Sequence, residues 1–140
     1  MTEDFESNVK RFLSKWNELN DLYQEICPEG NHHIGFPDPL QKNLLSLYDP
    51  SLIKPVGKSS YDFNGIVEVK SSTLAGGGNT PFQVSQANCN RVIYLEIGKK
   101  IEIYDINDVT VIQEINNKIK NGENVILKQY KDKGKTKTIG

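Results

Sequence analysis

The sequence predicts an α/β (α+β) fold in which a central mixed β-sheet of four to five strands is flanked by helices. Apolar residues recur at helical spacing near the start of the chain and again after residue 107, whereas the middle contains short runs of β-branched and aromatic residues. The predicted order of helix, helix, four strands and helix is typical of a sheet with helices packed around it. A chain of 140 residues is long enough for one domain with one modest core.

Two helices are predicted in the first third of the chain. Apolar residues recur at helical spacing over residues 3–26, and a proline and a glycine follow that segment directly. A shorter helix is predicted over residues 39–48, with Asp38 as its capping residue and Pro39 at its first position. We interpret residues 1–50 as a helical part, and the aromatic-rich stripe of its first helix is the candidate contact with a second subunit.

The middle of the chain predicts β-structure. Asn64-Gly65 is a strong turn signal between two short strand candidates, and Gly98-Lys99 joins two longer ones. Between these hairpins we expect a glycine-rich loop followed by a short helix. The predicted strands are residues 60–63, 66–71, 91–97 and 100–106, the loop is 75–81, and the helix is 82–90.

The last third predicts one more helix and one more strand. Apolar residues of 107–120 fall on one helical face, and Asn121-Gly122 ends that helix. Residues 125–130 are a candidate strand. The lysine-rich residues 131–140 are expected to be a mobile tail.

Composition excludes several classes of protein. No run approaches the roughly 18–20 apolar residues that a membrane span needs, and two cysteines are too few for a disulfide scaffold. The acidic N-terminus lacks the apolar region of a signal peptide. We therefore expect a cytoplasmic protein with no membrane partner.

The formal net charge of −1 is unevenly distributed along the chain. Residues 1–50 hold nine acidic and four basic residues, whereas residues 51–100 hold three acidic and six basic residues. Such asymmetry says more about partners than the total charge does. The near-neutral total therefore does not exclude a nucleic-acid partner.

The most informative chemistry lies around residue 65. Side chains alternate along a strand, so Glu68 and Lys70 are expected on one face, and the Asn64-Gly65 turn folds Asp62 back toward them. Two carboxylates, with carbonyls and waters, suit Mg²⁺, which neutralises developing charge on a phosphate and lowers the pKa of a bound water. A lysine there positions or deprotonates that water.

This pattern of an upstream Asp, a short hairpin and (D/E)-x-K resembles the PD-(D/E)xK nuclease superfamily, and within it the small homodimeric type II restriction endonucleases. The similarity covers residues 52–106, although Tyr61 stands where the signature has proline. The resemblance implies a restriction-endonuclease-like fold, with residues 1–140 as a single nuclease domain and 52–106 as its catalytic core. It further implies that Asp62, Glu68 and Lys70 are the catalytic residues. It also implies that Asp62, Glu68 and Val69 bind Mg²⁺, for which Mn²⁺ substitutes.

In that family, the segment after the motif reaches into a DNA groove. Here this segment is rich in Asn, Gln, Ser and Thr, which hydrogen-bond base edges, while basic residues contact phosphates. Lys54 is a further candidate for a backbone contact. The residues expected to contact double-stranded DNA are Lys58, Ser71, Asn79, Thr80, Gln83, Ser85, Gln86, Asn88 and Arg91.

The sequence thus favours a Mg²⁺-dependent type II restriction endonuclease acting as a homodimer, and it leaves several alternatives open. Asp38 is a rival to Asp62 as the first metal ligand, because it lies in a literal Pro-Asp-Pro. A structure-specific nuclease of the same fold, such as a Holliday-junction resolvase or a repair nickase, is one alternative function. A non-catalytic DNA- or protein-binding module, in which the E-x-K is incidental, is another.

Overall fold

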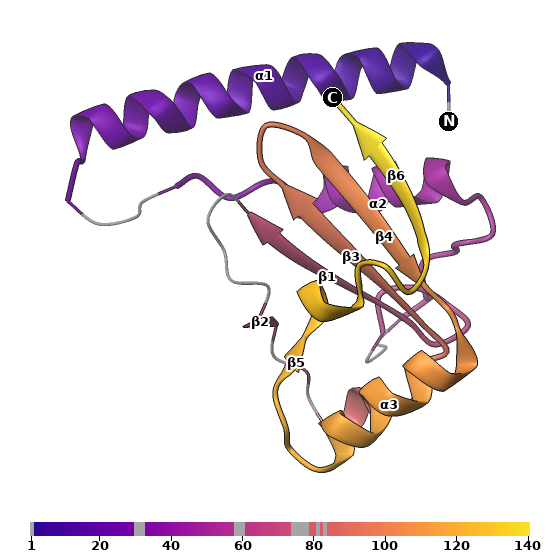
Figure 1. The fold of residues 1–140 in the computed structure, drawn as a ribbon. Helices are drawn as coiled ribbons and strands as arrows, with labels where there is room; N and C mark the ends of the chain where they lie inside the picture. The colour runs from indigo at the N-terminus through magenta and orange to yellow at the C-terminus, as the bar shows by residue number, and fades with distance from the viewer. Residues whose placement is uncertain (1, 30–32, 58–60, 74–78, 81, 83) are drawn as a thin grey trace.

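A four-stranded mixed sheet forms the centre of the computed structural model (Figure 1), which describes residues 2–29, 33–57, 61–73, 79, 80, 82 and 84–140. The strand order is β1-β3-β4-β6. The first pair is parallel and the other two pairs are antiparallel. The strands are β1 (Val67–Thr73), β3 (Arg91–Ile97), β4 (Ile101–Ile106) and β6 (Lys135–Ile139). A separate antiparallel pair joins β2 (Asn79–Thr80) to β5 (Val125–Ile126).

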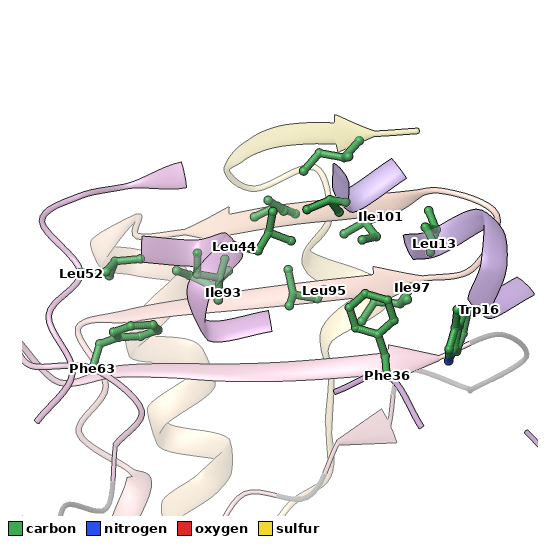
Figure 2. Close-up of a cluster of buried hydrophobic side chains, with 14 of the residues drawn as sticks. Leu13, Trp16, Phe36, Leu44, Leu52, Phe63, Ile93, Leu95, Ile97 and Ile101 are labelled. Atoms are coloured by element: carbon green, nitrogen blue, oxygen red, sulfur yellow. The ribbon is translucent and has the colours of Figure 1, made fainter. Parts of the chain in front are cut away.

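Helices cover both faces of this sheet, so the predicted mixed sheet flanked by helices is confirmed. Helices α1 (Glu3–Ile26) and α2 (Asp38–Tyr48) contribute to one buried cluster, and α3 (Val109–Lys120) contributes to the other. Because side chains alternate along β3, Ile93 and Leu95 lie in the first cluster while Val92 and Tyr94 lie in the second. Figure 2 shows side chains from α1, α2 and the sheet meeting in the first cluster.

The predicted ends of the helices are largely confirmed. Thr2 caps α1 by accepting a hydrogen bond from the backbone of Phe5. Asp108 caps α3 in the same way. The predicted cap of α2 is wrong, because its N-cap is Pro37, and Asp38 is already the first helical residue and makes no capping bond.

Three short predicted elements differ from the structure. In place of strand 60–63, an isolated antiparallel bridge joins Phe63 to Val67 across the turn. The predicted helix 82–90 is reduced to a single 3₁₀ turn, η1 (Val84–Gln86). The predicted strand 125–130 is β5 followed by a second 3₁₀ turn, η2 (Leu127–Tyr130), because a three-residue spacing buries both Leu127 and Tyr130 on the α3 side.

The expectation of a mobile tail over residues 131–140 is wrong, because β6 is an edge strand of the main sheet. Ile139 is buried at 1% exposure and pairs with Ile101. A side chain at Gly134 would overlap the carbonyl oxygen of Asp105, so only glycine allows this close approach of β6 to β4. Lys137 pairs with Glu6 of α1 at 3.0 Å.

None of the described helices is both long enough and apolar enough to cross a membrane.

Replacing Ile139 with alanine is expected to lower the free energy of unfolding by about 2–4 kcal/mol, because the change leaves a cavity in the core. Thr138 is exposed on the same strand and provides the control, whose alanine variant should stay within about 0.5 kcal/mol of the wild type. Urea unfolding measures both. Wild-type stability in both variants would contradict the presence of β6.

Candidate active site

Strand β1 presents Glu68 and Lys70 on the same face. Val67 and Val69 pack into the cluster beneath α1 and α2, so the alternating residues Glu68 and Lys70 lie toward the α3 side. The Lys70 ammonium lies 4.8 Å from the centre of the Phe82 ring, which attracts it electrostatically. The strand therefore brings one carboxyl group and one ammonium group to one surface of the sheet.

The turn before β1 carries Asp62 back onto that strand. Gly65 and Ile66 have left-handed backbone conformations, with φ of +81° and +62°. This conformation is unusual for a β-branched residue. The Asn90 backbone donates to Ile66 at 2.9 Å, and the Asn90 side chain donates to Gly65 at 3.3 Å, so Asn90 holds the turn. The Val69 N–H then donates to Asp62 Oδ2 at 2.9 Å.

Asp62 and Glu68 form a carboxyl pair whose members differ in protonation. Glu68 is only 3% exposed, and burial followed by the neighbouring Asp62 raises its pKa from 4.5 to about 8. Burial also disfavours the charge on Asp62, but hydrogen bonds from Glu68, Val69 and Lys42 together lower its pKa. A proton on this pair is therefore held more tightly by Glu68 than by Asp62.

One oxygen of this pair has no partner among the described residues. Glu68 Oε2 is buried and accepts no hydrogen bond from them. Leaving a buried polar atom unsatisfied is unfavourable, so such an atom requires an explanation. A hard divalent cation is a suitable partner, because such cations prefer carboxylate oxygens and displace their protons.

Lys42 of α2 completes the group and was missed by sequence reasoning. Its ammonium lies 3.1 Å from Asp62 Oδ1 and 3.9 Å from Asp38 Oδ2. The structure thus places Asp62 beside Glu68, whereas the side chain of Asp38 is 74% exposed on α2. The Asp38–Lys42 spacing predicts a helical ion pair, but no feature of the sequence indicates that Lys42 also reaches Asp62.

Arg91, predicted to contact DNA, instead lies in an internal ion-pair network. Its guanidinium is 2.7 Å from Asp49 and 2.7 Å from Asp105, and Tyr48 also donates to Asp105. The pKa of Arg91 is raised, first by its hydrogen bond to Asp105. Asp105 reaches Arg91 across the β3–β4 pair, and Asp49 reaches it where α2 ends against the sheet. A contact of Arg91 with DNA stays a prediction.

The other predicted DNA contacts are scattered. Ser71 is exposed on the face of β1 opposite to Glu68 and Lys70. Ser85 and Asn88 are exposed, Gln86 is half-buried, and the Tyr61 hydroxyl donates to the backbone carbonyl of Ser85 at 3.2 Å. Four predicted contacts lie outside the described residues or have side chains outside them: Lys58, Gln83, Asn79 and Thr80.

In the described part of the chain, no group of three or more His, Cys, Asp and Glu side chains has the arrangement of a metal site. The assignment of Asp62, Glu68 and the Val69 backbone as metal ligands stays a prediction. Comparisons with protein-family models, curated proteins and solved structures found no match to this chain. Inference about function therefore depends on the chemistry of these residues.

The protein without metal is expected to lose stability as the pH rises from about 5 to about 8. Folded Glu68 has a pKa of about 8, whereas the reference value is 4.5, so the folded state holds a proton that the unfolded state releases in this range. The contribution of Glu68 is therefore full below pH 4.5 and is lost as the pH rises through about 8. Urea unfolding across this range measures the loss.

Glu68→Gln should remove most of this pH dependence, and Glu123→Gln, at an exposed position, should retain it. Identical pH profiles for the wild type and Glu68→Gln would contradict the assignment of the proton to Glu68.

Proposed function

We propose that this protein is a Mg²⁺-dependent endonuclease that hydrolyses phosphodiester bonds of double-stranded DNA, most closely a cytoplasmic type II restriction enzyme. The observation that carries the proposal is the Asp62–Glu68 pair beside Lys70, in which Glu68 is buried and its Oε2 has no partner in the described part of the chain. The same proposal includes the resemblance of Asp62, Glu68 and Lys70 to the PD-(D/E)xK pattern. It also includes the assignment of the mixed sheet to a restriction-endonuclease-like fold.

Side-chain and backbone groups of this site suit phosphodiester hydrolysis in three ways. Asp62 and Glu68 would hold the cation. The Val69 carbonyl would join them, because the N–H and C=O of one residue in an extended strand point to the same side and its N–H already faces Asp62. A bound Mg²⁺ supplies charge neutralisation and an acidified water. Lys70, whose ammonium lies over the Phe82 ring, would position the attacking water and stabilise negative charge that develops on the phosphate.

Glu68→Ala and Lys70→Ala are expected to reduce plasmid cleavage in Mg²⁺ by at least about a hundredfold while DNA binding persists. Lys99→Ala, at an exposed lysine on the β3–β4 turn, is the control and should cleave normally. Full cleavage by both site variants would overturn the assignment.

Mapping the fragment ends tests the class of nuclease. Ends at one repeated sequence support a restriction enzyme. Cleavage of four-way junctions or nicking without sequence preference supports the structure-specific alternative, and no cleavage in Mg²⁺ or Mn²⁺ supports the non-catalytic binding module.

A homodimer is part of this proposal: one subunit has one active site, so a double-strand cut needs two subunits or two encounters with the DNA. Helix α1 carries an apolar stripe that the described residues leave partly exposed: Phe12 is 41% exposed, Leu19 51%, Leu22 49% and Ile26 70%. In an antiparallel pair of α1 helices centred on Leu19, Phe12 faces Ile26 of the second copy. Glu25 of that copy then lies between Arg11 and Lys15, beside a hollow at Phe12. The surface is thus self-complementary, as a two-fold dimer requires.

Ile26→Glu is expected to convert the dimer to a monomer, because it places a charge in the apolar stripe at both ends of the pair. Val109→Glu is the matched control, since Val109 is 80% exposed on α3 and lies outside the stripe. Light scattering after size-exclusion chromatography gives the mass of each. A monomeric wild type would contradict the dimer.

A further inference from the structure

A hollow of about 280 Å³ adjoins the carboxyl pair on the α2 side. It is lined by Lys42 of α2, by the segment containing Lys54, Pro55 and Gly57, and by Tyr61 and Asp62. The backbone of Asn64 donates to Ile53 at 2.8 Å, which fixes the Lys54 segment against the turn that presents Asp62. Two lysines therefore converge on a space that borders a proposed metal ligand.

The two lysines of this hollow would be able to bind an anion once a cation occupies Asp62 and Glu68. Lys42 is 27% exposed and pairs with Asp62, while Lys54 is exposed. A divalent cation on Asp62 and Glu68 would compete with the Lys42 ammonium for Asp62 Oδ1 and would repel it. Lys42 would then share the hollow with Lys54, and its remaining carboxylate neighbour would be the exposed Asp38 at 3.9 Å. Two positive charges would thus face the same space after Asp62 is taken up by the cation.

We propose that Lys42 and Lys54 bind a backbone phosphate of the DNA substrate next to the phosphate that is cleaved, and that Lys42 exchanges Asp62 for this phosphate when the metal binds. This inference depends on the proposed nuclease function. A phosphodiester fits because it carries one negative charge and accepts hydrogen bonds from ammonium groups. Lys42 is thereby a substrate-positioning residue rather than only a structural partner of Asp62.

The test is the salt dependence of DNA binding, measured by fluorescence anisotropy with a labelled duplex and Ca²⁺ in place of Mg²⁺. Each phosphate contact adds about 0.9 to the slope of log K against log salt. Because both lysines hold one phosphate, the double variant Lys42→Gln/Lys54→Gln should reduce the slope by about 1, and each single variant by part of that amount. Lys42→Arg should retain the slope. Lys10→Gln, on α1 and outside the hollow, is the control.

The second measurement is Mn²⁺ binding without DNA, by calorimetry. Lys42→Gln should bind Mn²⁺ severalfold more tightly, because the competing ammonium is gone, whereas Lys54→Gln should bind as the wild type does. Urea unfolding checks that each variant is folded.

The outcomes separate this inference from the proposed function. Unchanged slopes in folded Lys42→Gln and Lys54→Gln, with a wild type that binds DNA, overturn the phosphate site alone. Unchanged Mn²⁺ affinity in Lys42→Gln overturns the exchange. A wild type that binds neither DNA nor Mn²⁺ overturns the proposed function, and the phosphate site with it.

Discussion

The pairing of β1 with β3 forces a carboxyl group into the protein interior. Val67 is buried beneath α1 and α2, and strand alternation then places Glu68 on the opposite face, where the cluster beneath α3 covers it to 3% exposure. Isolated burial of a charged carboxylate is strongly unfavourable. Accordingly, the pKa of Glu68 is raised, the pKa of the neighbouring Asp62 is lowered, and lysines from α2 and β1 lie nearby. The turn at Gly65–Ile66 and its contact with Asn90 are needed to bring Asp62 into this arrangement.

Local pattern predicted those features that depend on neighbours in the sequence. Helical spacing identified α1 and α3, strand alternation placed Glu68 and Lys70 together, and the Asn64-Gly65 turn returned Asp62 to β1. Features that depend on distant contacts were missed. Nothing local shows that α2 brings Lys42 to Asp62. The lysine-rich C-terminal sequence predicts a mobile tail, and only the pairing of Ile139 with Ile101 shows that it forms a strand.

The structure also changes the interpretation of the basic residues in the middle of the sequence. The basic middle of the sequence suggested a surface for nucleic acid, but Arg91 is committed to Asp49 and Asp105. Lys70 lies over Phe82. Positive charge in the sequence is therefore not equivalent to positive charge available at the surface. For phosphate recognition near the carboxyl pair, the described lysines that remain in position are Lys42 and Lys54.

A ligand can reach the carboxyl pair more easily from the side of Asp62 than from the side of Glu68. The Asp62 side chain is 23% exposed, whereas Glu68 is almost completely covered, so an approaching ligand meets Asp62 first. The hollow containing Lys42 and Lys54 borders Asp62 on this accessible side. For the proposed nuclease, the DNA backbone would thus approach past α2 and the segment before β1, with Lys42 and Lys54 holding one phosphate. In that nuclease, Lys70 would act from the α3 side of β1. Lys42 and Lys54 would hold the DNA strand, whereas Lys70 would position the attacking water.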